Sequence, residues 1–265
     1  MSLLHQVLIS SKFLVQERSC MNQEQYMQDF MRVFEGLERW APGSEKETLK
    51  ALSQLPEEPE NILEIGCGKG LSTALLTQNT KASIVATDTE TTAIRSTQDR
   101  CNKFGFADRV SVLNQSMDDL KFEENFFDLI WCEASVYVMG VEEALKSWRP
   151  LLKENGFLVY SDLVYLVDSP TQECLDFWSG EYPTMSTVVT SIERAQKLGF
   201  EVTQHFSFER SSWANYYDPI KSKLAELQSE LHGSAALEDL KREVEIYEKY
   251  LGEFGYEFFL LRVIS

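Results

Sequence analysis

Residues 62–70 read Ile-Leu-Glu-Ile-Gly-Cys-Gly-Lys-Gly, an apolar run that leads into a turn with glycines at alternate positions. Glycine lets the backbone pass close to a ligand, and a helix that starts after such a turn offers free N–H groups. Two carboxylates make the pattern more specific: Glu64 lies just before the turn, and Asp88 ends the next apolar run, 22 residues after Gly66. Because a carboxylate there can accept hydrogen bonds from both hydroxyls of a ribose, we expect a nucleotide-like ligand.

Short apolar runs alternate with helical stretches around this turn. Repeated strand–helix–strand order predicts an α/β fold: a Rossmann-like, doubly wound, mostly parallel sheet of seven strands, with helices on both faces and ligands at the carboxyl ends of the strands. The expected strands are 61–66, 83–88, 109–114, 127–133, 156–162, 200–208 and 256–264, and the expected helices lie near 70–78, 91–104, 141–153 and 190–198.

The first part of the chain, residues 1–60, is expected to be a helical segment that covers the site. Apolar side chains recur at helical spacing over 22–40, so one amphipathic helix is predicted there. Ser44 followed by Glu47 is a capping-box pattern, which predicts a second helix that ends near Leu55.

Residues 61–265 are expected to form one domain with two insertions. The insertion near 163–189 is rich in aromatic residues, and the one near 209–254 is largely helical and charged. Since the last strand returns to the sheet, both insertions are expected to act as lids on the active edge. Within the second, residues 236–251 carry apolar side chains at helical spacing, which fits lid packing or a dimer contact, so the chain is expected to be a monomer or a homodimer.

These motifs resemble the class I S-adenosylmethionine-dependent methyltransferases over most of the chain. The first motif of that family, acidic-x-Gly-x-Gly-x-Gly, is matched by Glu64 and the three glycines, and its ribose-binding acid is matched by Asp88. Ser116 to Asp118 fall where the family frames adenine, although many members have Asp in place of Ser116. The resemblance implies S-adenosylmethionine as cofactor and S-adenosylhomocysteine as product. The implied cofactor-binding residues are Glu64, Gly66, Cys67, Gly68, Gly70, Asp88, Thr89, Ser116, Met117, Asp118 and Glu133.

Within this class the sequence is most similar to bacterial small-molecule methyltransferases of the ubiquinone/menaquinone biosynthesis-like type. The similar stretches are Pro42-Gly43-Ser44, Ser116-Met117-Asp118, Trp131-Cys132-Glu133, Trp178 and Trp213. This resemblance implies a small, partly apolar methyl acceptor, with aromatic and quinone-like compounds as candidates.

A nicotinamide dinucleotide is the alternative ligand, because its sites also combine glycines with a carboxylate about 20 residues further on. The spacing Gly66-x-Gly68-x-Gly70 lacks the extra residue of Gly-x-Gly-x-x-Gly. Glu64 directly before the turn also fits the sulfonium cofactor better, so S-adenosylmethionine is favoured.

Glu133 and Tyr137 are the candidate catalytic residues. Glu133 ends the run 127–133, where it can hold the methionine part of the cofactor, face the sulfonium cation or remove a proton from the acceptor. It is equally compatible with a solvated carboxylate at a strand end. Asp162, at the end of 156–162, has the same ambiguity.

Aromatic side chains gather in the segments expected above the cofactor. They can line a dry acceptor pocket or pack the lids against the core. The residues expected to line the pocket are Tyr137, Trp178, Tyr182, Trp213 and Tyr217.

The composition argues against several partners. Lys and Arg number 25 against 42 Asp and Glu, and the net charge of −17 repels phosphate backbones and anionic lipids, so neither nucleic acid nor a membrane is expected. Trp131 to Ala134 also replace the Asn-Pro-Pro-Tyr expected of enzymes that methylate amino groups of nucleic acid bases.

Five widely spaced cysteines suggest reduced thiols and a cytoplasmic protein. The three histidines share no ligand spacing with them, so no metal is expected.

The sequence therefore predicts an enzyme that transfers a methyl group from S-adenosylmethionine to a small molecule. The acceptor is held opposite the sulfur, and much of the acceleration comes from alignment. The alternative is a catalytically silent protein that binds S-adenosylmethionine as a sensor, or an interaction protein.

Overall fold

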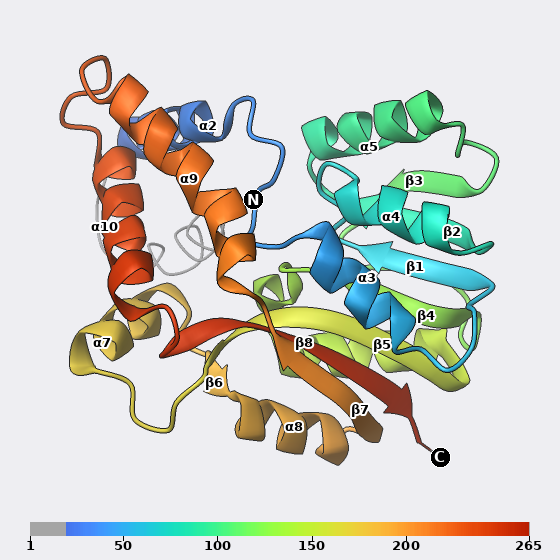
Figure 1. The fold of residues 1–265 in the computed structure, drawn as a ribbon. Coiled ribbons are helices and arrows are strands. Elements are labelled where there is room, and N and C mark those ends of the chain that lie inside the picture. The colour runs from blue at the N-terminus through green and yellow to red at the C-terminus, as the bar shows by residue number, and fades with distance from the viewer. Residues whose placement is uncertain (1–19, 265) are drawn as a thin grey trace.

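The computed structural model describes residues 20–264, and a twisted sheet runs through its centre (Figure 1). The strand order is β3-β2-β1-β4-β5-β8-β7, and a short strand, β6 (Ser186–Thr187), pairs with β5 outside this path. The first five strands in this order are parallel, whereas β8 is antiparallel to both of its neighbours. The predicted Rossmann-like, mostly parallel sheet is confirmed, but it has eight strands in the described residues, one more than the seven predicted, because β6 was not expected. Its other strands are β1 (Asn61–Ile65), β2 (Ser83–Asp88), β3 (Val110–Asn114), β4 (Phe127–Cys132), β5 (Leu152–Tyr165), β7 (Phe200–Ser207) and β8 (Phe254–Val263).

Successive side chains along each strand point to opposite faces of the sheet, and they contribute to two hydrophobic cores, one on each face. In β1, Ile62 belongs to one core and Leu63 to the other; in β4, Leu129 and Ile130 divide in the same way. This is the period of two that an extended strand imposes. The first face is covered by α3 (Glu45–Ser53), α4 (Leu71–Asn79) and α5 (Thr91–Phe104), and the second by α6 (Val141–Trp148) and α8 (Val188–Lys197).

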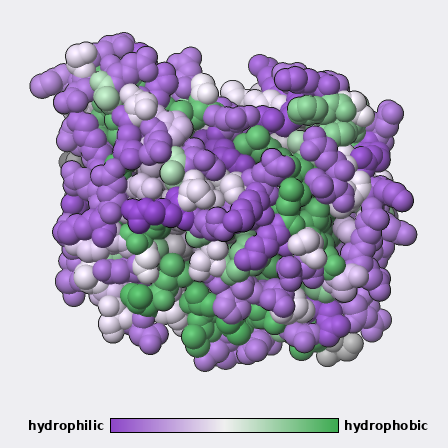
Figure 2. Space-filling view, viewed as in Figure 1, coloured by the Kyte–Doolittle hydropathy of each residue, from purple (hydrophilic) through white to green (hydrophobic). Residues whose placement is uncertain are grey.

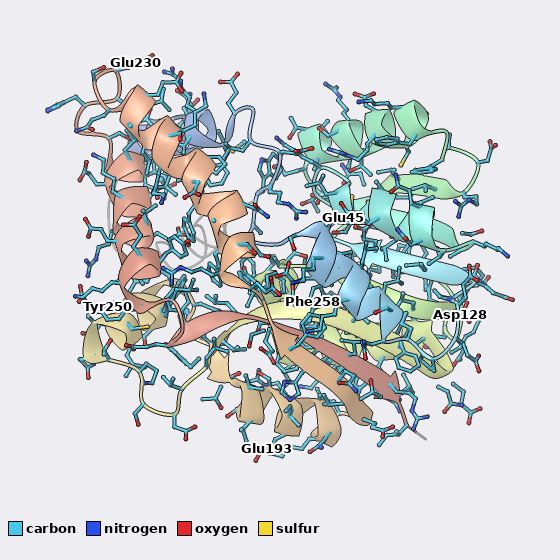
Figure 3. The ribbon with its side chains drawn as sticks, viewed as in Figure 1. Glu45, Asp128, Glu193, Glu230, Tyr250 and Phe258 are labelled. Carbon is cyan, nitrogen blue, oxygen red and sulfur yellow. The ribbon has the colours of Figure 1, made fainter. Side chains whose placement is uncertain are left out.

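A helical cap lies beyond the carboxyl ends of the parallel strands, at the left of Figure 1. We use this name for α2 (Cys20–Phe34), α7 (Gln172–Glu181), α9 (Arg210–Leu227) and α10 (Ala235–Tyr250). Glu230, labelled at the tip of the cap in Figure 3, accepts hydrogen bonds of 2.6 and 2.9 Å from the guanidinium of Arg32 and so ties α2 to the end of α9. Hydrophilic side chains cover most of the face in Figure 2, including the cap. Within residues 20–264, no helix combines the length and the apolar character needed to cross a membrane.

The helix predicted over 22–40 was too long, because α2 ends at Phe34. Gly36 has a φ of 77°, a left-handed conformation that stops the helix. The prediction for residues 1–19 lies outside the described part of the chain. Similarly, the helix predicted over 141–153 ends at Trp148, since Pro150 has no N–H to continue it.

The capping box predicted at Ser44 and Glu47 is also wrong in its details. Ser44 is the N-cap of α3 but makes no side-chain capping hydrogen bond to the backbone. The carboxylate of Glu47 instead turns towards α9, where it accepts hydrogen bonds from the Glu209 N–H (2.9 Å) and the Ser212 hydroxyl (2.6 Å). The same sequence pattern therefore fastens α3 to the cap.

The close packing of Gly70 against Thr97 of α5 can be tested directly. Gly70 has a φ of 74°, and a Cβ there would lie 2.8 Å from Oγ1 of Thr97. Gly105 has nearly the same φ, 73°, with nothing within 4 Å of such a Cβ. Each alanine costs roughly 1 kcal/mol for its left-handed backbone, and we expect Gly70→Ala to cost a further ~1–3 kcal/mol from overpacking. Urea unfolding of both variants measures this difference; equal losses of stability would contradict the packing described.

Candidate cofactor site

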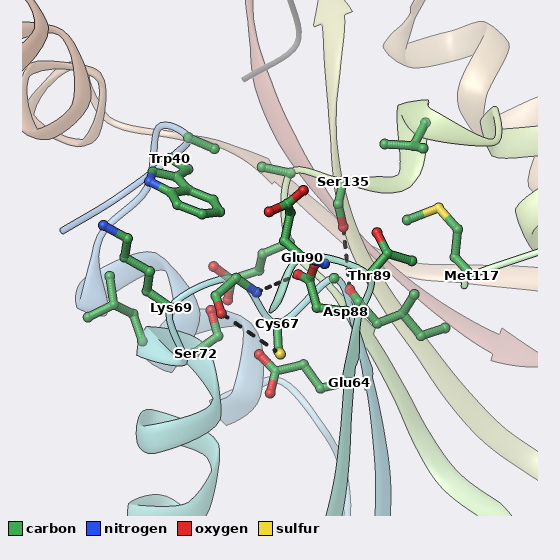
Figure 4. Close-up of a pocket in the computed structure, with 18 of the residues that line it drawn as sticks. Trp40, Glu64, Cys67, Lys69, Ser72, Asp88, Thr89, Glu90, Met117 and Ser135 are labelled. Carbon is green, nitrogen blue, oxygen red and sulfur yellow. Dashed lines mark hydrogen bonds between the residues drawn. The ribbon is translucent and has the colours of Figure 1, made fainter. Parts of the chain in front are cut away.

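A cavity of about 230 Å³ opens at the carboxyl ends of β1, β2 and β4 (Figure 4). Its walls come from the turn between β1 and α4, the end of β2, the loop after β3, the end of β4 and the segment 38–42. The fold therefore brings together side chains that are far apart in the sequence. The predicted residues that line it are Glu64, Gly66, Cys67, Gly68, Asp88, Thr89, Ser116, Met117, Glu133 and Tyr137.

The glycine turn presents bare backbone to this cavity. Gly66 and Gly68 have φ values of 73° and 53°, which side-chain-bearing residues rarely adopt. A Cβ on Gly66 would lie 2.3 Å from the hydroxyl oxygen of Ser135, so no side chain fits there. A Cβ on Gly68 would meet no heavy atom within 4 Å, because this position faces open space. A ligand can thus approach the backbone of the turn at Gly68.

Asp88 is held at the rim of the cavity by backbone donors. Its Oδ2 accepts a hydrogen bond of 2.9 Å from the Gly68 N–H, and its Oδ1 accepts one of 2.9 Å from the Glu90 N–H. A carboxylate oxygen has two lone pairs, so each oxygen keeps one acceptor position for a ligand. The half-buried side chain is therefore oriented to receive two hydroxyl groups, as a ribose would provide.

Glu64 brings a buried acid to the same cavity. Its side chain is only 2% exposed, and its Oε2 has no hydrogen-bond partner. Burial, together with the nearby carboxylates of Glu133 and Asp88, raises the pKa of Glu64 to about 8, although hydrogen bonds with Thr73 act in the opposite direction. A cationic ligand would supply the missing partner, and S-adenosylmethionine carries both an ammonium and a sulfonium. The residues present therefore fit this cofactor.

Glu133 is positioned by two elements that the sequence did not connect. Its Oε1 accepts hydrogen bonds of 2.9 Å from the Thr48 hydroxyl of α3 and 2.9 Å from the indole N–H of Trp131. Burial raises the pKa of Glu133, and these hydrogen bonds work in the opposite direction. The side chain is thus fixed at the cavity wall and is not a freely solvated strand end. Its role in binding or catalysis stays a prediction.

Residues 1–60 were expected to cover the site, but no residue of the segment 38–42, which lines the cavity, was among the predicted site residues. Trp40 lines the cavity, with the ammonium of Lys69 5.0 Å from its ring centroid. The Lys69 ammonium also donates a hydrogen bond to the carbonyl of Leu37, so this segment is fastened to the glycine turn. Figure 4 shows Trp40 and Lys69 on the same side of the site. A tryptophan directly before Ala41-Pro42-Gly43, where the helix pattern breaks, was the only sequence signal.

A second, nearly filled cavity of about 10 Å³ adjoins the first, because both are lined by Trp40, Ala41 and Pro42. Its other walls include three residues predicted for the acceptor pocket, Trp178, Trp213 and Tyr217.

Several predicted residues lie elsewhere. The hydroxyl of Tyr182 donates to the carboxylate of Asp162 (3.1 Å), and neither residue lines either cavity. Gly70 is buried against Thr97, and Asp118 is exposed outside the first cavity.

Within the described residues, no three His, Cys, Asp or Glu side chains come together as a metal site. The four described cysteine side chains, which exclude that of Cys20, are buried and free.

The buried acids predict that the ligand-free protein loses stability as pH rises. Burial raises the pKa of Glu64 to about 8 and that of Asp162 to about 7, whereas the unfolded chain releases these protons near 4.5 and 3.8. Each protonated acid stabilises the folded state fully at pH values below its pKa in the unfolded chain. This stabilisation falls by about 1.4 kcal/mol per pH unit for each group, until the pH reaches the pKa in the folded protein. Urea unfolding between pH 5 and 8 should therefore show a falling free energy of unfolding.

Glu64→Gln should reduce this pH dependence, to which Asp162 still contributes, and Glu123→Gln, at an exposed position, should leave it unchanged. An identical slope in Glu64→Gln and the unchanged protein would show that Glu64 is ionised in the fold.

Known proteins resemble the chain in sequence around this cavity. Residues 62–156 match the family model of a methyltransferase domain. A tRNA1(Val) (adenine(37)-N6)-methyltransferase of Shewanella baltica is 27% identical over 128 residues, 47% of this chain and 52% of that protein. A sarcosine/dimethylglycine N-methyltransferase of Halorhodospira halochloris is 22% identical over 200 residues, 74% of this chain and 71% of that protein. The chain thus spans about half the length of the first of these relatives.

The fold also matches solved structures. A S-adenosylmethionine-dependent methyltransferase from Geobacter sulfurreducens, in complex with S-adenosyl-L-homocysteine, superposes with a TM-score of 0.75 at 14% identity, covering 89% of this chain and 98% of that one. At this identity the likeness concerns the fold. The chain therefore has the Rossmann-like fold of solved S-adenosylmethionine-dependent methyltransferases, and its residues 62–156 match a methyltransferase domain.

Proposed function

We propose that this protein transfers a methyl group from S-adenosylmethionine to a small, partly apolar acceptor that binds beneath the helical cap. The observation that carries the proposal is the pair of adjoining cavities. The first is lined by the glycine turn and Asp88, the second by aromatic side chains, and the segment Trp40–Pro42 belongs to both. An acceptor in the second cavity would lie next to a cofactor in the first.

The residues of the first cavity have distinct tasks in this proposal. When bound, S-adenosylmethionine supplies an electrophilic methyl group on a positively charged sulfur. Asp88 accepts the ribose hydroxyls, the glycine turn gives the cofactor access to the backbone, and the buried carboxylate of Glu64 complements its positive charge. Ser116 and Met117 line the cavity where adenine is expected. Alignment of the two reactants can contribute up to about 7–11 kcal/mol, so no strong base is required.

Glu133 and Tyr137 are the two candidate catalytic residues, and both line the first cavity. Burial raises the pKa of Tyr137, so its hydroxyl stays protonated and can donate a hydrogen bond. Glu133 has its Oε1 engaged by Thr48 and Trp131, which favours a positioning or charge-complementing role over that of a mobile base.

The buried position of the second cavity under the cap favours a small acceptor. The aromatic residues of the second cavity are buried: Trp178 is 2% exposed, Trp213 2% and Tyr217 2%. A polymer would need an open groove lined by cations, whereas the chain has a net charge of −17. One of the similar proteins is a tRNA methyltransferase. This chain departs from the pattern expected of base-methylating enzymes, because β4 ends in Trp-Cys and Glu133-Ala134 follow.

A methyl-transfer assay tests the proposal. We expect protein incubated with S-adenosylmethionine labelled in the methyl group to label the small-molecule fraction of a cell extract. Asp88→Ala removes two charge-assisted hydrogen bonds to the ribose, each worth ~1.5–3 kcal/mol, so it should lower cofactor affinity and labelling at least tenfold. Asp99→Ala, at an exposed position on α5, is the matched control and should label normally.

Transfer to tRNA or protein instead of small molecules would contradict the proposed acceptor class. Tight cofactor binding without any transfer would favour the silent sensor.

A further inference from the structure

Glu243 of α10 is a buried acid inside the aromatic cavity. Its side chain is 3% exposed, and it lines the second cavity. Its Oε1 accepts a hydrogen bond of 2.7 Å from the Tyr217 hydroxyl, whereas its Oε2 is buried without a partner. A carboxylate with one unpaired oxygen is costly in an apolar environment, so this oxygen marks a position where a ligand would add a hydrogen bond.

The described residues that line the cavity carry no positive charge that would balance Glu243. Among the described residues that line it, none is Lys, Arg or His, and six of the ten are aromatic: Trp40, Trp178, Trp213, Tyr216, Tyr217 and Tyr256. Burial raises the pKa of Glu243 to about 7, and the hydrogen bond from Tyr217 offsets only part of this effect. The described walls thus hold no positive charge that would keep Glu243 ionised, and a cationic ligand would supply one.

The same walls favour a cation for a second, independent reason. The faces of tryptophan and tyrosine rings attract positively charged groups, and most strongly where water is excluded. The indole N–H groups of Trp40 and Trp178 are also buried without a partner, so the residues that line the cavity offer two free donors beside the free acceptor of Glu243. The excess of acidic residues over the whole chain would further attract cations and repel anions.

We propose that Glu243 is the group that recognises the methyl acceptor, and that the acceptor is a small aromatic amine whose ammonium faces Glu243 while its ring packs among the aromatic walls. This inference depends on the proposed function, because it assigns the second cavity to the acceptor. As described, the cavity has room for roughly one water molecule. Amine binding must therefore displace some of the aromatic side chains that line it.

Matched ligand pairs test the inference. Benzylamine and phenethylamine carry an ammonium, whereas benzyl alcohol and 2-phenylethanol are neutral compounds of nearly the same shape. We would titrate each into the protein by calorimetry with saturating S-adenosyl-L-homocysteine present. The amines should bind at least tenfold more tightly than their alcohols. Glu243→Gln keeps an oxygen for the Tyr217 hydrogen bond and should abolish this preference. Glu245→Gln, at an exposed position on the same helix, should retain it.

The controls separate this inference from the proposed function. Binding of S-adenosyl-L-homocysteine should be unchanged in Glu243→Gln, which also reports that the variant is folded. The inference is overturned if the alcohols bind as tightly as the amines, if none of the four compounds binds, or if the preference survives in a folded Glu243→Gln protein. A failure of the unchanged protein to bind S-adenosyl-L-homocysteine would instead overturn the proposed function. The comparison of amines with alcohols in the unchanged protein decides the question even if the variant does not fold.

Discussion

The turn after β1 has a left-handed backbone at its glycines, and this conformation constrains the segments that pack around the cofactor site. Gly66 lies against Ser135 of the loop after β4, Gly70 lies against Thr97 of α5, and the Gly68 N–H is bound by Asp88 at the end of β2. The turn therefore fixes three neighbouring segments relative to one another. Because Gly68 has no side chain and faces open space, the turn does so while leaving its own backbone open to a ligand there.

The two cavities lie in different parts of the fold, one at the sheet and one largely within the cap. The first is built on strand ends, which are held by hydrogen bonds along the sheet, and it contains the buried acid Glu64. The second is built from cap helices and contains one buried acid, Glu243. The segment 38–42 joins them, and the Gly43 N–H that follows it donates to the carbonyl of Ser212 in α9 (3.1 Å). Cofactor site and cap are thus mechanically connected.

The sequence predicted the sheet well, because strand and helix periods and the glycine turn are local signals. The match of Glu64 and Asp88 to the first cavity followed from the same local pattern. The sequence alone could not predict contacts between distant segments, such as that of Thr48 with Glu133 or of Glu47 with Ser212. Glu243 left a signal that we did not use: it lies three residues after Leu240 and four before Tyr247, on the apolar face of its helix. An acid there must be buried once the helix packs.

A crystal structure of the protein with S-adenosyl-L-homocysteine would test the central claim most directly. The account predicts that the ligand occupies the cavity at the ends of β1, β2 and β4, with its ribose hydroxyls within hydrogen-bond distance of the Asp88 carboxylate and the backbone of Gly68 against the ligand. A ligand bound elsewhere, or in this cavity with its ribose away from Asp88, would contradict it.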